Sequence, residues 1–127
     1  MIERLRREWV AGLNRFDREG EILVGAFRRD QLVGVGGLNR DPYVEDPAVG
    51  RIRHVYVLNE ERRRAVGRGL IACLIKGADE HFNLVRLRTG RASAFYDSLG
   101  FAPTDEPNAT HQLTLPAPSQ HVGVAAE

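Results

Sequence analysis

Hydrophobic residues at the start of the chain recur every three or four positions, with mostly charged and polar residues between them. This spacing places them on one face of a helix. The pattern predicts an amphipathic helix over 2–15 that ends near Asp17–Gly20. Its hydrophobic face consists of Ile2, Leu5, Trp9, Leu13 and Phe16.

The next hydrophobic stretches predict an antiparallel hairpin. Residues 21–27 and 31–38 are rich in branched and aromatic side chains, as strands are, and Arg29-Asp30 between them fits a tight turn. Glycine is unusual inside a strand, where it indicates a bulge or a close approach of other atoms. The second strand contains Gly34, Gly36 and Gly37.

The rest of the chain alternates between short strands and helices. A loop is expected over 39–50, which carries Asp-Pro twice. The elements expected after it are a strand at 51–58, an arginine-dense turn at 59–66, a helix from Gly67 to about Phe82, a strand at 84–88, a short helix at 91–99 ended by Gly100, and strands at 101–104 and 110–115.

This order of elements predicts an α/β fold with a sheet of mixed direction. At 127 residues the chain is expected to form a single domain over 1–115, followed by a flexible tail at 116–127. Cys73 is the only cysteine, so no internal disulfide is possible, and a reducing, cytoplasmic setting fits. We expect neither a membrane segment nor a signal peptide, and a net charge of +1 argues against nucleic-acid binding.

A strand, an arginine-rich turn and a helix follow one another over 55–82. The N-terminus of a helix offers free N–H groups and a positive dipole end, which together bind anions such as pyrophosphate. The turn lacks the P-loop and dinucleotide-binding signatures, and a nucleotide site would also need a lysine and magnesium ligands. A solvated arginine face at a glycine-containing helix start is the alternative.

Residues 21–115 resemble the GNAT acetyltransferase family in the order and spacing of these elements. The family signature Q/R-x-x-G-x-G/A fits in two registers. Residues 64–69 match its letters, whereas 62–67 have Ala65 in place of the first glycine but lie at the family's distance from Val57. We prefer the second register, because that distance determines where the backbone amides lie. The resemblance implies acetyl-CoA as co-substrate, no metal, and these coenzyme-binding residues: Val55, Tyr56, Val57, Arg62, Arg63, Arg64, Ala65, Val66, Gly67 and Arg68.

A second signature lies at Ala92–Phe101, which resembles the family's A-x-x-x-Y-x-x-L-G-F element. The resemblance implies that Tyr96 lies near the coenzyme sulfur and protonates the departing thiolate. The alternative is an ordinary helical tyrosine packed on Phe95 and Phe101. Where family members often carry an asparagine, this chain has Thr89, which can cap the short helix.

The resemblance also implies a bulge in the strand at 55–57, which separates it from the strand at 84–88. Backbone groups freed there would bind the pantetheine arm and the thioester oxygen. Plain sheet core is the alternative for these side chains.

The general base is not evident from the sequence. Many family members have a glutamate at the position of Arg51 or Arg53, and arginine cannot act as a base. His54 is the nearest titratable residue, although a lone strand histidine is more often structural. The further candidates are Asp41, Glu45 and Asp46 on the preceding loop, and His111.

Strand alternation puts two arginine pairs, 51 with 53 and 86 with 88, each on one face of its strand. If the two strands are neighbours, the four could form a basic surface for an acceptor with a carboxylate or phosphate. A solvated arginine row is the alternative.

The family usually opens with a strand and a helix before the helix expected at 2–15, and this sequence begins inside that pattern. The first strand is absent, or a partner supplies its edge, or the start codon is misassigned. An exposed strand edge is a liability, which favours a homodimer. The leading hypothesis is an N-acetyltransferase acting on a small-molecule or peptide amine. The alternative is a GNAT-like module that binds coenzyme A without turnover.

Overall fold

The computed structural model describes residues 16–58 and 63–116. The predicted helix at 2–15, Arg62, and residues 117–127 of the predicted tail lie outside the described residues.

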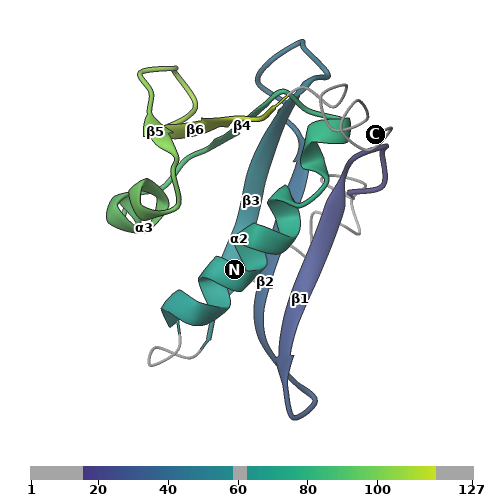
Figure 1. The fold of residues 1–127 in the computed structure, drawn as a ribbon, viewed down its shortest axis with the longest axis vertical. Coiled ribbons are helices and arrows are strands. Elements are labelled where there is room, and N and C mark those ends of the chain that lie inside the picture. Colours follow the sequence, from purple (N-terminus) through teal and green to yellow (C-terminus); the bar gives the residue numbers. More distant parts are fainter. Residues whose placement is uncertain (1–15, 59–62, 117–127) are drawn as a thin grey trace, which may run out of the picture.

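Six strands form one open sheet in the order β1-β2-β3-β4-β6-β5, and only β3 and β4 run parallel (Figure 1). The predicted mixed, mostly antiparallel sheet is therefore confirmed. The strands are β1 (Ile22–Arg28), β2 (Gln31–Arg40), β3 (Val49–Val57), β4 (Leu84–Leu87), β5 (Ala102–Pro103) and β6 (His111–Thr114).

The hairpin of β1 and β2 turns at Arg29 and Asp30, which have φ values of 50° and 67°. Positive φ at both central residues gives a turn whose twist matches that of the strands. The loop predicted at 39–50 is shorter than expected. Asn39 and Arg40 extend β2 by pairing with Arg51 and Gly50, because the neighbouring strand outweighs the local turn signals.

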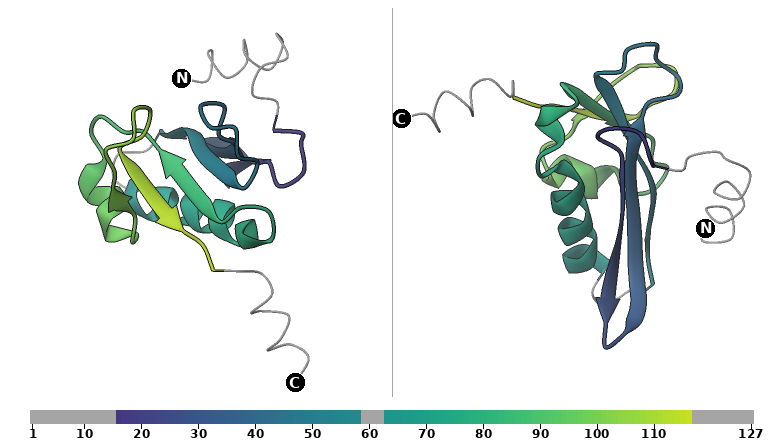
Figure 2. Two further views of the ribbon diagram at one scale, coloured as in Figure 1. Left: turned by 90° about the horizontal axis from the view of Figure 1, so that it is seen from above. Right: turned by 90° about the vertical axis from the view of Figure 1, so that its right-hand side faces the viewer.

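Helix α2 (Arg63–Ile75) covers one face of β1, β2 and β3 (Figures 1 and 2). The prediction of a helix over 67–82 was wrong at both ends. The helix begins four residues earlier, because arginine favours helices. It is separated from the 3-10 turn η2 (Ala78–Glu80) by Gly77, whose φ of 78° is left-handed.

Glycines of β2 let α2 approach the sheet closely. A Cβ at Gly34 would lie 3.1 Å from side-chain atoms of both Leu70 and Val66, and one at Gly36 would lie 3.3 Å from Leu74. On the opposite face, a Cβ at Gly37 would lie 2.5 Å from the ring of Phe16. The predicted close approach at these glycines is confirmed.

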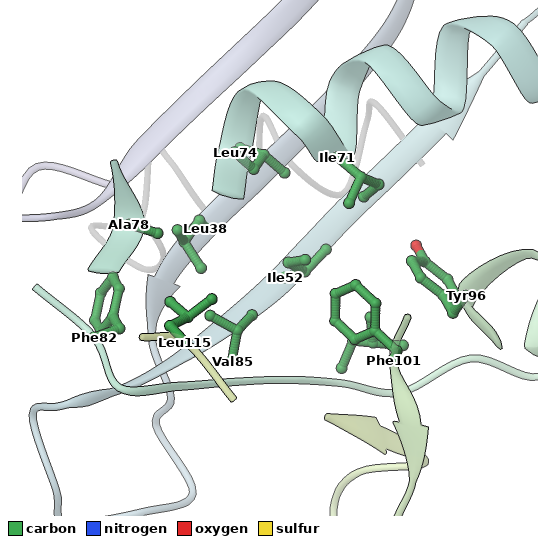
Figure 3. Close-up of a cluster of buried hydrophobic side chains, with 11 residues drawn as sticks. Leu38, Ile52, Ile71, Leu74, Ala78, Phe82, Val85, Tyr96, Phe101 and Leu115 are labelled. Atoms are coloured by element: carbon green, nitrogen blue, oxygen red, sulfur yellow. The ribbon is translucent and has the colours of Figure 1, made fainter. Parts of the chain in front are cut away.

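The hydrophobic core lies between the sheet and the helices (Figure 3). Tyr96 stands at one end of this cluster beside Phe101, with its hydroxyl oxygen turned away from Phe101. The buried cluster consists of Leu38, Ile52, Ile71, Leu74, Ala78, Phe82, Val85, Leu87, Tyr96, Phe101 and Leu115. Over the described ranges, no helix is both long enough and apolar enough to cross a membrane.

Candidate active site: a cleft between β3 and α3

The two parallel strands in the middle of the sheet separate after a short paired segment. β3 and β4 pair only through Val49 with Leu84, Gly50 with Val85, and Arg51 with Arg86. Beyond Arg51 a cleft of about 500 Å³ opens between β3 and the helix α3 (Ser93–Ser98). The predicted separation of these strands is therefore confirmed. The lining residues are Ile52 to Val57, Gly67, Leu87, Arg88, Thr89, Arg91, Ala92, Phe95 and Tyr96.

A bulge in β3 lies where the cleft opens. Val35 pairs with Tyr56 and Gly37 pairs with Arg53, so that two residues of β3 lie opposite the single Gly36. One of these two residues is His54, whose φ of 57° is left-handed. Histidine is among the non-glycine residues enriched in this conformation, which costs on the order of 1 kcal/mol. The predicted bulge is confirmed, and its first residue is His54.

The side chain of His54 is buried, with 7% of its surface exposed. Its ring packs edge-on against Phe16 at a centroid distance of 6.0 Å. The structure thus gives His54 a constrained backbone, an aromatic neighbour and a position at the cleft wall. Among the described lining residues of the cleft it is the only histidine, and no aspartate or glutamate accompanies it.

Tyr96 lies on the other wall, on α3. Its ring packs in near-perpendicular arrangements against Phe95 at 5.0 Å and Phe101 at 5.6 Å, measured between centroids. Only 6% of the residue is exposed. Burial raises the pKa of the Tyr96 phenol from 10.0 to about 12, because the phenolate would lose its hydration. The phenol therefore keeps its proton across the physiological range.

Helix α3 ends in a motif that fixes the position of Tyr96. The N–H of Phe101 donates to the carbonyl of Tyr96, and the N–H of Gly100 donates to that of Asp97, both at 3.1 Å. Gly100 has φ 94°, and the Phe101 and Tyr96 rings pack together. These are the bonds and the hydrophobic contact of a Schellman motif. The predicted role of Gly100 in ending the helix is confirmed.

The predicted anion-binding turn at 62–67 is part of a helix from Arg63 onward. In an α-helix only the first-turn N–H groups lack an intrahelical acceptor, here those of Arg63, Arg64 and Ala65. In an α-helix that begins at Arg63, the N–H groups of Gly67 and Arg68 face the carbonyls of Arg63 and Arg64. The predicted binding of a pyrophosphate by the backbone of roughly Arg63 to Arg68 stays a prediction.

Residues 65–68 of this helix line or contact different sites. Gly67 lines the cleft, where a Cβ would lie 3.1 Å from the ring of Phe95. Ala65 and Val66 instead line a separate groove between β1 and α2. Nη2 of Arg68 donates to Ser98 Oγ of α3 at 3.3 Å, and this contact joins the two helices.

The four arginines of β3 and β4 divide between two sites. Arg51 is buried, lies 3.6 Å from Asp41 across an ion pair, and stacks on Tyr43 at 4.8 Å. Its sheet neighbour Arg86 pairs with Glu106 at 3.7 Å. Arg53 and Arg88 line the cleft. The expectation of one continuous surface was therefore wrong, because two of the arginines are held by acids.

The other candidate bases do not line the cleft. Asp41 and Asp46 accept N–H bonds from Tyr43 and Ala48, both at 2.9 Å, and so shape the loop at 41–48. Glu45 is exposed on that loop. His111 is bonded to Asp97 behind Tyr96.

Sequence reasoning did not single out Arg91 and Phe95 as cleft residues, nor the bond between Asp97 and His111. Phe95 and Asp97 are neighbours of Tyr96 within the second signature, which was the available signal. Nothing local relates Asp97 to His111, because their contact depends on the register of β6 against β4.

A profile described as an acetyltransferase (GNAT) domain matches residues 18–103. The chain is similar to a candidate acetyltransferase from Exiguobacterium sp. 255-15, with 26% identity, a TM-score of 0.79, and coverage of 100% of this chain and 80% of the other. It shares its fold with a ribosomal-protein-alanine N-acetyltransferase from Brucella melitensis, at 24% identity and a TM-score of 0.65, over 88% of this chain and 78% of the other.

The same fold occurs in the PaiA N-acetyltransferase from Thermoplasma acidophilum, solved in complex with coenzyme A. That structure has 17% identity and a TM-score of 0.61, and the match covers 86% of this chain and 66% of the other. No curated protein sequence matches the chain. The profile match over most of the chain, together with the sheet, bulge and cleft, identifies the protein as a member of the GNAT acetyltransferase family.

Proposed function

We propose that the protein is an acetyl-CoA-dependent N-acetyltransferase that transfers an acetyl group to a primary amine by direct attack in a ternary complex. The observation that carries the proposal is that one cleft has the protonated phenol of Tyr96 on one wall and the bulged backbone at His54 on the other.

The cleft suits coenzyme A for two reasons. From Ile52 onward, β3 has β2 on one side and no paired strand of the described residues on the other, so backbone groups of Val55–Val57 are available to the amides of the pantetheine arm. Gly67 of α2 lines the same cleft, and the first turn of that helix lies one turn before it in the chain. A helix N-terminus stabilises a pyrophosphate through its first-turn N–H groups and its dipole.

In the proposed reaction His54 accepts a proton from the acceptor ammonium, and the amine nitrogen then attacks the thioester carbon. The new C–N bond forms, a β3 backbone donor stabilises the oxyanion, and the C–S bond breaks. Tyr96 gives its proton to the sulfur and is reprotonated from solvent, and His54 releases the proton it accepted to solvent. The nitrogen loses its second proton to solvent, and the products are the acetylated amine and free coenzyme A.

The raised pKa of Tyr96 fits a proton donor, since the phenol is fully protonated before each turnover. A donor with a pKa of about 12 is weak toward a solvated thiolate. However, a thiol in the same cleft also goes from neutral to anionic on losing its proton, so burial raises its pKa as well. The two shifts partly cancel, and the transfer stays feasible.

The alternative is a GNAT-like module that binds coenzyme A without turnover. It is favoured by Arg51 and Arg53, which stand where many family members carry a glutamate. Thiol release from acetyl-CoA should be followed over a panel of amines with wild type, Tyr96→Phe and His54→Gln. Turnover that collapses in Tyr96→Phe supports the enzyme. Calorimetric binding of coenzyme A with no thiol release from any amine supports the module.

The acceptor class is proposed from the arginines that line the cleft, Arg53 and Arg88. Two guanidinium groups favour a small-molecule or peptide amine that also carries a carboxylate or phosphate. Arg53→Gln should then raise the acceptor KM for such amines and leave that of uncharged amines unchanged. An equal KM change for both groups would contradict this acceptor class.

We also propose a homodimer that works in the cytoplasm. β1 is an edge of the described sheet, and its Phe27 is 67% exposed, which supports association through that strand. The single exposed Cys73 fits a reducing compartment. Sedimentation equilibrium of wild type and Phe27→Lys tests the dimer, and a monomer in both would overturn it.

A further inference from the structure

A network of polar contacts joins α3 to β6 and to the segment before α3, beside Tyr96. Nε2 of His111 lies 3.0 Å from Oδ1 of Asp97, the residue that follows Tyr96. Nδ1 of the same ring lies 3.0 Å from the hydroxyl of Thr110. That hydroxyl oxygen accepts the N–H of Thr89 at 3.0 Å. The hydroxyl of Thr89 in turn accepts the N–H of Ala92 at 3.0 Å, at the start of α3.

The hydrogen-bond partners determine which atom donates and which accepts in each contact of this network. A carboxylate only accepts hydrogen bonds, so Nε2 of His111 donates to Asp97. In the neutral ring Nδ1 is then an acceptor, and the Thr110 hydroxyl donates to it while accepting from the Thr89 N–H. Each polar group therefore has a partner, in a site where the His111 side chain is only 5% exposed.

The contacts hold α3 on both sides of Tyr96. Thr89 caps the N–H of Ala92, and the N–H of Tyr96 donates to the Ala92 carbonyl at 3.1 Å. Asp97 anchors the following residue to β6 through His111. The His111 ring itself lies 6.3 Å from the Tyr96 ring. The contacts of Thr89 before Tyr96 and of Asp97 after it are therefore linked, because the hydroxyl of Thr110 contacts both Thr89 and His111.

Asp97 is a poor choice for α3 on local grounds. Aspartate has a low helix propensity, and its charge lies near the negative end of the helix dipole. Its side chain is 54% exposed, so burial does not account for it either. The structure gives it one evident use, the bond to His111.

We infer that Asp97 and His111 are positioning residues, which hold the Tyr96 phenol at the cleft wall so that it can reach the sulfur. The inference rests on the proposed function for its catalytic consequence, but the constraint on the Tyr96 ring is a property of the fold and can be measured without any substrate.

The first test measures the motion of the Tyr96 ring by NMR in Asp97→Ala and Asp97→Asn. The chain has three tyrosines, so the spectrum of Tyr96→Phe assigns the signals. Asp97→Ala removes the acceptor and should speed ring flipping about tenfold, whereas Asp97→Asn keeps an Oδ1 acceptor and should resemble wild type. An unchanged flip rate in Asp97→Ala overturns the inference.

The second test is kinetic. Asp97→Ala and His111→Phe should lower kcat about tenfold with the KM for acetyl-CoA unchanged, since small displacements of a catalytic group cost up to about 10²-fold. Asp97→Asn should restore most of kcat. In a Tyr96→Phe background Asp97→Ala should cause no further loss, because it acts through the missing hydroxyl. An equal loss in both backgrounds means a structural role only.

The two tests separate this inference from the proposed function. If the Tyr96 ring flips faster in Asp97→Ala but wild type turns over no amine, the positioning role is retained and the transferase is rejected. Normal turnover with an unchanged ring flip retains the transferase and rejects the positioning role. Asp97→Ala is the primary variant because an exposed helical residue tolerates alanine, so a failure of His111→Phe to fold does not prevent the test.

Discussion

One wall of the cleft is β3, a strand of 9 residues that pairs along its length with β2 and packs under α2, whereas the other wall is α3, a helix of 6 residues. β4, β6 and β5, which support α3, have 4, 4 and 2 residues. The β3 wall contributes mainly backbone groups to the cleft, and the α3 wall contributes the phenol of Tyr96.

The difference shows how the two kinds of chemical group are held. Backbone groups are placed by a strand ladder, which spreads the constraint over many hydrogen bonds. A side chain at the end of a short helix depends on a few contacts, here the Schellman motif at Gly100 and the bond between Asp97 and His111. We therefore expect side-chain changes to be tolerated on the β3 wall, except at the proposed base His54 and at Arg53, and to be costly at Tyr96 and its supports on the α3 wall.

The largest effect should come from removing the Tyr96 hydroxyl on the α3 wall, with removal of the Tyr56 hydroxyl on the β3 wall as the control. Tyr96→Phe should lower kcat by about 10²–10⁴-fold, the usual contribution of a positioned proton donor. Tyr56→Phe should leave kcat unchanged, because Tyr56 contributes its backbone. Steady-state thiol release measures both. A comparable loss in the two variants would contradict the division between backbone and side chain.

Alkaline pH should lower the free energy of unfolding through Tyr96 on the α3 wall. The pKa of Tyr96 is 10.0 in the unfolded chain and about 12 in the fold, so the unfolded state loses its proton first. The contribution of Tyr96 to the free energy of unfolding is fully present below pH 10 and is lost as pH rises to about 12. The loss is on the order of 1 kcal/mol per pH unit, or about 3 kcal/mol in all.

Urea unfolding of wild type and Tyr96→Phe across this pH range checks the assignment. The variant should lack this part of the pH dependence, and Tyr56→Phe should retain it. Parallel pH profiles for wild type and Tyr96→Phe would mean that Tyr96 is not the group responsible.

The packing of α2 on β2, the strand beside the β3 wall, should be sensitive to volume at Gly34. A Cβ there would lie 3.1 Å from Leu70 and Val66, and 3.2 Å from the backbone oxygen of Tyr56. Gly34→Val should destabilise the fold by about 1–3 kcal/mol through overpacking, as measured by chemical denaturation. Gly69→Ala is the matched control. Nothing lies within 4 Å of its Cβ position, so it should stabilise α2 by about 0.4–1 kcal/mol.

The smallest effect should follow from Gly100→Ala. Gly100 has φ 94° with open space around its Cβ position, so the cost is backbone strain alone, about 1–2 kcal/mol. Because Gly100 ends α3, kcat should fall as well as the thermal midpoint. Gly90→Ala, which also meets no atoms within 4 Å and has no positive φ, should change neither.

Local patterns in the sequence were enough to predict the hairpin, the order of the later elements and the end of α3 at Gly100. They were not enough for the start of α2, where a run of arginines was interpreted as a turn although it is helical from Arg63. They also suggested a single basic surface, whereas Arg51 and Arg86 are held by Asp41 and Glu106. Those partners come from distant loops, which no short pattern records.

The sequence by itself determined the element types and the position of Tyr96 relative to Gly100, because helix periodicity, strand alternation and the left-handed preference of glycine act over a few residues. The tertiary structure alone decided which groups face one cleft. Pairing of β3 with β4 ends at Arg51, so the wall beyond it opens. β6 lies beside β4 in a register that opposes Leu87 to His111, and this brings His111 to Asp97. Such contacts depend on strand register, which is set by the packing of the whole sheet.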